Sequence, residues 1–306
     1  MEFLTKKYKN VLIENQKIAV VGDKTLTTEK VTEFYKDAPF PNYNDFQSKS
    51  DLLQIINSNP FVKDLKDKIG FNKKFIEVGS GTSQLSLALA SGTNNEIVAL
   101  DPTLESLKLG AEFAAQNNIN NVKFLNADIF NNPIKNDYFD FVWCSGVLHH
   151  TQNSEEGFNI IYNWLKPGGT IIIGLYNSYG RLRTNIRQFI YKTLGKGNLS
   201  RNLILKLDPY LRQVMSDAKR EAWIRDQYEH PVERSHTLGE VLKWFKNKDV
   251  NFIGSIPSPT LETSYQPIDY MDGEKGTPTS RVLSQINMLF SNSGKEGGLF
   301  IVIGKK

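Results

Sequence analysis

Cysteine and histidine are scarce in this sequence. A single cysteine, Cys144, and four histidines stand among 306 residues. One cysteine cannot close an intrachain disulfide, and so few thiol and imidazole groups leave little from which to build a metal cage. We therefore predict no metal site, and the cysteine content favours a reducing, cytoplasmic setting.

Long apolar runs are missing as well. The longest, at 169–176 and 298–303, are the length of a strand and fall far short of the roughly 20 apolar residues that span a bilayer. The first ten residues lack the apolar stretch of a signal peptide. We expect no membrane span.

The composition is that of a globular protein. Hydrophobic residues make up 40% of the chain and charged residues 23%, with a formal net charge of +4. These values exclude a disordered, collagen-like or coiled-coil chain. The length favours one elaborated domain with insertions.

Short β-branched runs alternate with helical patterns from Lys73 onwards, which predicts an α/β fold with a mainly parallel sheet. A later helix should begin at a capping box of Thr237 and Glu240. The predicted helices between the first five strands lie near 83–91, 103–117 and 154–165. The predicted strands are 74–78, 96–100, 122–125, 138–144, 170–176, 250–256 and 299–304.

Three further stretches surround this pattern, and we expect them to cover a binding site. Residues 1–70 should form a hairpin at 11–13 and 18–21 and helices near 28–36 and 50–68. Residues 177–236 should form two or three amphipathic helices, one of them starting after Asp208–Pro209. Residues 257–297 should be mostly loop, with a helix near 281–289. The predicted organisation is an N-terminal extension and lid at 1–70, a core at 71–176, a helical insertion at 177–236, and a C-terminal part at 237–306 with a loop insertion at 257–297.

A glycine-rich turn, 77–83, follows the first core strand and opens a helix. Gly79 and Gly81 let the backbone approach a ligand closely. Asp101 ends the second strand, where a carboxylate can accept hydrogen bonds from both hydroxyls of a ribose. The alternative reading of Asp101–Pro102 is a helix cap.

Another acid, Asp128, follows the third strand and is placed to accept from the exocyclic amine of adenine, while the backbone N–H of Ile129 meets a ring nitrogen. Together these residues predict an adenosine site. An NAD-dependent oxidoreductase is disfavoured because no third glycine stands at Gln84.

The ordered motifs of residues 73–176, with the terminal strands, resemble the class I S-adenosylmethionine-dependent methyltransferases. The resemblance implies a Rossmann-like, seven-stranded, mostly parallel sheet with helices on both faces, an antiparallel last strand, and S-adenosylmethionine as cofactor. Ser83 departs from the family pattern, where Gly or Ala is common. The cofactor-binding residues implied are Glu77, Gly79, Ser80, Gly81, Asp101, Pro102, Asp128, Ile129, Ser145 and Gly146.

His149 and His150 follow the fourth strand and are the candidates for acid–base catalysis, since imidazole titrates near neutrality. The resemblance favours His150. A structural hydrogen bond is the alternative role for either. A zinc pair is disfavoured because adjacent side chains diverge and a third ligand is not evident.

The aromatic and proline-rich stretch 34–43 could fold over the cofactor as a lid, with a packed N-terminal arm as the alternative. The candidates for the acceptor site are the turn 176–181 after the fifth strand and the stretch 226–233. The alternative is that the last two merely close the insertion. The substrate-binding residues that we predict are Tyr43, Tyr176, Asn177, Tyr179, Arg181, Tyr228 and His230.

The segment 181–225 carries eleven Lys and Arg against three Asp and Glu. Its charges alternate with an apolar stripe, which is typical of a solvated helix face and does not favour nucleic acid. We predict methyl transfer to a small or medium-sized metabolite by in-line displacement. The alternatives are an RNA or lipid head-group methyltransferase that uses the basic insertion, and a non-catalytic S-adenosylmethionine-binding protein; a homodimer stays open.

Overall fold

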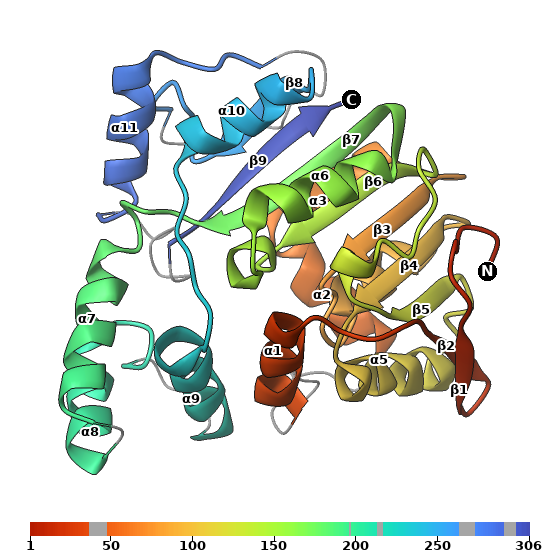
Figure 1. Ribbon diagram of the computed structural model, residues 1–306, viewed down its shortest axis with the longest axis horizontal. Helices are drawn as coiled ribbons and strands as arrows, with labels where there is room; N and C mark the ends of the chain where they lie inside the picture. The colour runs from red at the N-terminus through yellow and green to blue at the C-terminus, as the bar shows by residue number, and fades with distance from the viewer. Residues whose placement is uncertain (37–47, 196, 213–216, 263–272, 291–297) are drawn as a thin grey trace.

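The computed structural model describes residues 1–36, 48–195, 197–212, 217–262, 273–290 and 298–306. In this part of the chain nine strands form one sheet, in the order β1-β2-β5-β4-β3-β6-β7-β9-β8 (Figure 1). The strands are β1 (Lys9–Ile13), β2 (Gln16–Val20), β3 (Lys74–Val78), β4 (Glu96–Asp101), β5 (Val122–Asn126), β6 (Phe139–Ser145), β7 (Leu165–Tyr176), β8 (Asn251–Ile256) and β9 (Leu299–Lys305).

Neighbouring strands from β2 to β7 are parallel, and β9 runs antiparallel to both β7 and β8. This confirms the predicted fold class and the antiparallel last strand. The expected number of seven strands is wrong, because the hairpin β1–β2 joins the sheet. Its residues Ile18 to Val20 pair with β5, so β5 is not an open edge.

The helices are α1 (Leu26–Lys36), α2 (Lys49–Asn57), α3 (Pro60–Ile69), α4 (Gln84–Ala90), α5 (Leu104–Gln116), α6 (Ser154–Asn163), α7 (Leu182–Thr193), α8 (Asn198–Leu207), α9 (Asp217–Ile224), α10 (Leu238–Asn247) and α11 (Pro278–Asn287). Two 3₁₀ turns, η1 (Ile129–Asn131) and η2 (Leu148–His150), follow β5 and β6, and a π-helical turn, η3 (Arg225–Glu229), continues α9.

Helices cover both faces of the sheet (Figure 1). On one face α6 and α10 pack through residues such as Phe158 and Phe245. On the other face α2, α3, α4 and α5 contribute a second apolar cluster that includes Leu65 and Leu107. Because both faces are buried, the central strands are continuously apolar, as in Ile171 to Ile173.

The first addition differs from the prediction at one point. The single helix expected over 50–68 is two helices, because the Asn59 side chain accepts hydrogen bonds from Phe61 N and Val62 N and Pro60 follows it. The predicted helix near 28–36 is present as α1.

The helical insertion holds α7, α8 and α9, which pack around their own apolar cluster of Tyr191, Ile204 and Tyr228. The helix expected to start after Asp208–Pro209 is wrong. Asp208 instead ends α8, and its carboxylate accepts hydrogen bonds from Tyr210 N, Trp223 Nε1 and Tyr228 OH. Asp208 therefore ties the end of α8 to α9 and η3.

The capping box predicted at the start of α10 is half formed. The Thr237 side chain accepts from Glu240 N, as expected. The Glu240 carboxylate, however, bonds His236 Nδ1 at 2.9 Å. The loop insertion contains α11, while its segments 263–272 and 291–297 lie outside the described residues.

Candidate functional site

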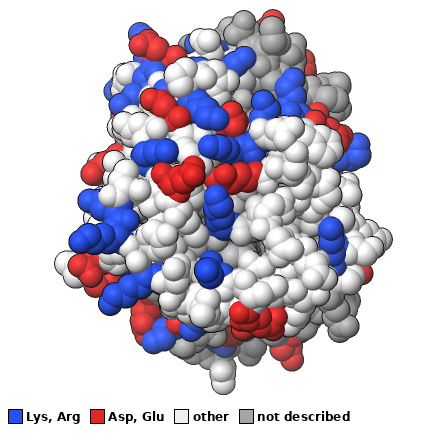
Figure 2. Space-filling model, turned by 90° about the vertical axis from the view of Figure 1, so that its right-hand side faces the viewer, with Lys and Arg blue, Asp and Glu red and all other residues white. Residues whose placement is uncertain are grey.

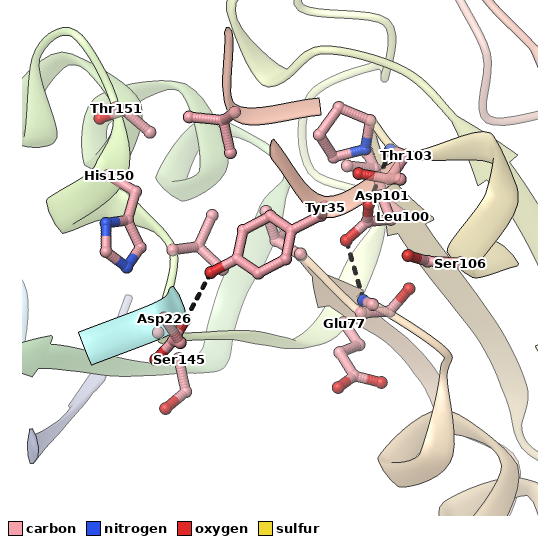
Figure 3. A pocket seen from close by; sticks show the side chains of 18 of the residues that line it. Tyr35, Glu77, Leu100, Asp101, Thr103, Ser106, Ser145, His150, Thr151 and Asp226 are labelled. Atoms are coloured by element: carbon pink, nitrogen blue, oxygen red, sulfur yellow. Dashed lines mark hydrogen bonds between the residues drawn. The ribbon is translucent and has the colours of Figure 1, made fainter. Parts of the chain in front are cut away.

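A cavity of about 600 Å³ opens where the parallel strands end, which is the usual ligand position in open α/β sheets. Strands β3, β4, β5 and β6 and the turns after them form its floor, and α1, α9 and η3 lie across from them (Figures 1 and 3). Of the residues predicted from sequence, those that line it are Glu77, Gly79, Ser80, Gly81, Asp101, Pro102, Asp128, Ile129, Ser145, Gly146, His150 and Tyr176.

The turn after β3 is shaped for close approach. Gly79 has a φ of 70°, and a Cβ built on it would stand 2.1 Å from Val147 Cγ2, so a side chain does not fit there. Ser83 has a φ of 66°, a left-handed conformation that costs a residue other than glycine about 1 kcal/mol or more. This conformation explains why glycine suits the position at which the sequence departs from the family pattern.

Glu77 is buried beneath this turn. Its Oε2 accepts from Ser86 N at 2.9 Å and Ser86 Oγ at 2.6 Å. Burial raises its pKa to about 7, against the opposing effect of the two hydrogen bonds. A positively charged ligand group at this carboxylate would favour its ionised form.

Asp101 is held at the end of β4 by the backbone. Its Oδ2 accepts from Gly81 N at 2.8 Å and its Oδ1 from Thr103 N at 2.7 Å (Figure 3). Burial raises its pKa, and these hydrogen bonds oppose the shift. Each oxygen keeps a second lone pair, so Asp101 both caps the next helix turn and can accept from a ligand.

Asp128 accepts structural hydrogen bonds that the sequence does not predict. It is 1% exposed, its Oδ2 accepts from Thr25 N at 2.8 Å, and its Oδ1 accepts from Phe130 N at 3.0 Å. The contact with Thr25 fastens the segment before α1 to the floor of the cavity. Asp128 therefore positions α1 as well as facing the cavity.

The two histidines of η2 differ in position. His150 faces the cavity, and its Nδ1 lies 2.8 Å from the carbonyl oxygen of Val232. A carbonyl only accepts, so Nδ1 carries the proton and Nε2 of the neutral ring keeps a lone pair. His149 is fully buried outside the lining, and its Nδ1 accepts from Tyr176 N at 3.2 Å.

Burial lowers the pKa of His150 to about 3 and that of His149 well below its usual value. His230 stacks on His150 with the ring centroids 3.6 Å apart, and burial lowers its pKa to about 3 as well. All three imidazoles are thus neutral near pH 7.

A polar network closes the side of the cavity opposite Asp101. Tyr35 OH from α1 donates to Asp226 Oδ1 at 2.6 Å (Figure 3), and Gln227 Nε2 donates to Asp226 Oδ2 at 2.7 Å. Tyr176 OH lies 3.4 Å from Asp226 Oδ2. Burial, together with the Asp226 carboxylate, raises the pKa of Tyr35 well above its usual value, so its hydroxyl stays a donor.

Several predicted substrate residues support this network from outside the lining. Arg181 is fully buried, pairs with Glu233, and places its guanidinium 3.5 Å above the ring of Tyr176. Asn177 Nδ2 donates to Gln285 Oε1. The predicted substrate residues outside the cavity lining are Asn177, Tyr179, Arg181, Tyr228 and His230, while Tyr43 lies outside the described residues.

Sequence reasoning missed part of the lining. Tyr35 lies in the stretch expected to form a lid and Asp226 in a stretch expected at the acceptor site, but the sequence did not indicate which residue of either faces inward. The missed lining residues include Thr28, Val31, Tyr35, Thr151, Tyr210, Trp223, Asp226 and Gln227. In the described chain, no group of three or more His, Cys, Asp or Glu side chains could hold a metal ion, and none of the described helices has the length and apolarity to cross a membrane.

A family model described as a methyltransferase domain matches residues 69–225, just over half of the chain. The chain therefore belongs to this methyltransferase-domain family. The match confirms the resemblance to the class I S-adenosylmethionine-dependent methyltransferases, with S-adenosylmethionine as the cofactor.

Curated relatives are distant and partial. The demethylmenaquinone methyltransferase of Staphylococcus haemolyticus (strain JCSC1435) is 29% identical over 140 residues, covering 42% of this chain and 57% of that protein. The ubiquinone/menaquinone biosynthesis C-methyltransferase UbiE of Proteus mirabilis (strain HI4320) is 28% identical over 105 residues, covering 33% and 42%. The chain thus matches about half the length of these relatives.

Among solved structures, PKMT2 from Rickettsia typhi in complex with AdoHcy superposes with a TM-score of 0.54. It is 16% identical, and the match covers 76% of this chain and 48% of that one. At this identity the likeness shows the fold alone.

Proposed function

We propose that this protein transfers the methyl group of S-adenosylmethionine to a small or medium-sized acceptor. The observation that carries the proposal is one cavity shared by the turns after four parallel strands and by a roof of α1, α9 and η3. Its volume of about 600 Å³ lies in the range of pockets that enclose small ligands.

The floor residues fit the cofactor by their chemistry. In this assignment Asp101 accepts from the ribose hydroxyls, Asp128 and Ile129 meet the adenine, and Glu77 faces the cationic end of the methionine part. Ser145 ends β6, Gly146 follows it, and both line the cavity. The Gly79 turn, which admits no side chain, supports close backbone approach.

The bound cofactor supplies a methyl group already activated by its sulfonium. The protein therefore has to orient the acceptor in line, exclude water, and receive a proton where the acceptor carries one. His150 is the candidate proton acceptor, since its Nδ1–H is committed to Val232 O and Nε2 is free to accept. Tyr35 and Tyr176 enclose the same region.

A small acceptor is favoured over a polynucleotide because α1 roofs the cavity and is tied to the insertion by Tyr35 and Asp226. Figure 2 shows the side of β1 and β2, away from the insertion, where basic and acidic side chains are interspersed. Methylation of RNA or a lipid head group stays the alternative. The cytoplasmic setting and a homodimer stay predictions.

Two measurements test the proposal. Calorimetry should show binding of S-adenosylhomocysteine and no binding of NAD⁺ under the same conditions. Incubation with methyl-labelled S-adenosylmethionine and a fractionated metabolite extract should then label a small molecule. Binding of NAD⁺ alone would refute the cofactor assignment, and tight cofactor binding with no labelled product from any extract fraction would favour the non-catalytic alternative.

A further inference from the structure

Carboxylates dominate the charged groups of the cavity. Glu77, Asp101, Asp128 and Asp226 line it, and no Lys or Arg occurs among the described residues of the lining. The first three stand at the ends of β3, β4 and β5, in the part assigned to the cofactor. Asp226 comes from η3 and lies on the other side, near Ser145 and His150 (Figure 3).

Asp226 is buried, with 9% of its surface exposed, and its hydrogen-bond partners are neutral. They are the hydroxyls of Tyr35 and Tyr176 and the amide of Gln227. Arg181 lies beyond Tyr176, but its guanidinium pairs with Glu233. Within the described chain, Asp226 therefore has no ion-pair partner. Because a buried carboxylate is stabilised by an opposite charge, this site favours the binding of a ligand that carries a cationic group.

Three aromatic rings line the cavity from α1 and the insertion. Tyr35 reaches Asp226 from α1 (Figure 3), and Tyr210 and Trp223 line the same cavity from the insertion. The last two rings stack on each other with centroids 3.9 Å apart, and Asp208 fixes Trp223 through Nε1 at 3.0 Å. Aromatic faces beside a carboxylate are the surroundings that stabilise an ammonium group.

We propose that the methyl acceptor is an amine, which binds as an ammonium ion between Asp226 and the rings of Tyr35, Tyr210 and Trp223. The inference rests on the proposed methyltransferase function and names its substrate class. A phosphate, carboxylate or phenolate acceptor would be repelled by the Asp226 carboxylate.

The reaction balances with groups at the site. The bound ammonium loses one proton to water, and His150 Nε2, whose ring stays neutral, accepts an N–H hydrogen bond of the amine and orients its lone pair. The freed nitrogen lone pair forms a bond to the methyl carbon as the carbon–sulfur bond breaks, and the electron pair of that bond stays on sulfur. The product is an N-methylated ammonium ion, which keeps its charge opposite Asp226.

A pair of isosteric probes tests the charge requirement directly. Choline carries a quaternary nitrogen, and 3,3-dimethylbutan-1-ol has carbon in its place. With the protein loaded with S-adenosylhomocysteine, we expect choline to bind about tenfold or more tightly than the neutral alcohol. In Asp226→Asn the two affinities should fall within about threefold of each other. In Trp223→Leu, which keeps the carboxylate, choline should bind several-fold more weakly.

Glu229→Gln is the matched control, since Glu229 lies in the same turn, bonds Tyr191 OH and does not line the cavity. It should keep the preference for choline. Equal affinity for both probes, a preference that survives in Asp226→Asn, or no choline binding at 10 mM would each overturn the inference. S-adenosylhomocysteine affinity, measured first in each variant, reports separately on folding and on the proposed function.

Discussion

The two ends of the cavity are built in different ways. At the end of the cavity assigned to the cofactor, each carboxylate accepts one backbone hydrogen bond from close in sequence: Asp101 from Thr103 N, Asp128 from Phe130 N, and Glu77 from Ser86 N. Asp101 and Asp128 each accept a second one from farther away, from Gly81 N and Thr25 N. At the acceptor end the partners are remote. Tyr35 and Asp226 are 191 residues apart, and His150 and Val232 are 82 apart.

The difference follows from the geometry of a parallel sheet. Parallel strands place their carboxyl ends at one edge, so the turns after β3, β4 and β5 meet there whatever the rest of the chain does. The acceptor end exists only when α1 and the insertion pack against each other. Substitutions at the two ends should therefore separate cofactor binding from turnover.

The largest effect is expected from His150→Ala. Removing one positioned proton acceptor should lower turnover roughly 100-fold and leave the affinity for S-adenosylhomocysteine nearly unchanged. Steady-state kinetics on the identified acceptor and calorimetry measure the two quantities. Because the His150 pKa is about 3, the wild-type rate should show no inflection near pH 6.5 from this group.

Two further variants decide whether His150 acts on the proton or only positions the loop. His150→Asn can still donate to Val232 O but lacks a base, so it should stay slow if the proposal is right. His236→Asn is the matched control, because His236 is buried and hydrogen-bonded to Ser154 but does not line the cavity. Full turnover in His150→Ala would leave proximity alone as the mechanism.

Sequence alone placed the three carboxylates assigned to the cofactor at the ends of neighbouring strands, because their motifs directly follow strands that periodicity reveals; their binding roles stay predictions. Glu77, Asp101 and Asp128 all face the cavity. The sequence did not indicate that these carboxylates also hold neighbouring segments in place. Asp128, for example, accepts a hydrogen bond from Thr25 N. That contact depends on how the segment before α1 packs against the sheet.

At the end assigned to the acceptor, seven residues were predicted from sequence, and of the six that the structure describes only Tyr176 lines the cavity. Arg181 looked like a pocket residue because of its place after β7, but its charge is neutralised in a buried pair with Glu233. Tyr228 likewise turns its hydroxyl to Asp208. Long-range packing decides which side of a turn faces a cavity. A five-residue π turn such as η3 is too short to show a hydrophobic periodicity that would indicate its inward-facing residues.

A smaller effect is expected from Asp101→Ala, which removes the acceptor proposed for two ribose hydroxyls. Hydrogen bonds to a charged group contribute about 1.5 to 3 kcal/mol each before water compensates, so cofactor affinity should fall at least about tenfold. Asp140→Ala is the control, since Asp140 also accepts a backbone bond, from Lys74 N, outside the cavity lining. Both variants should lose stability, and unchanged cofactor affinity in Asp101→Ala would remove Asp101 from the site.

The smallest effect contrasts the two ends by their pH dependence. The pKa of His230 is about 3 in the folded protein, so unfolded chains take up a proton near pH 6.5 that folded chains refuse, and stability falls as pH drops from 7 to 5. Glu77, with a pKa of about 7, stabilises the fold at low pH and loses that contribution as pH rises through 7. In thermal unfolding, His230→Gln should reduce the acid-side fall in Tm by a few degrees, and Glu77→Gln should reduce the fall in Tm that Glu77 causes as pH rises from about 5 to 7. Parallel curves of Tm against pH for both variants and the wild type would contradict this assignment of opposite slopes to the two ends.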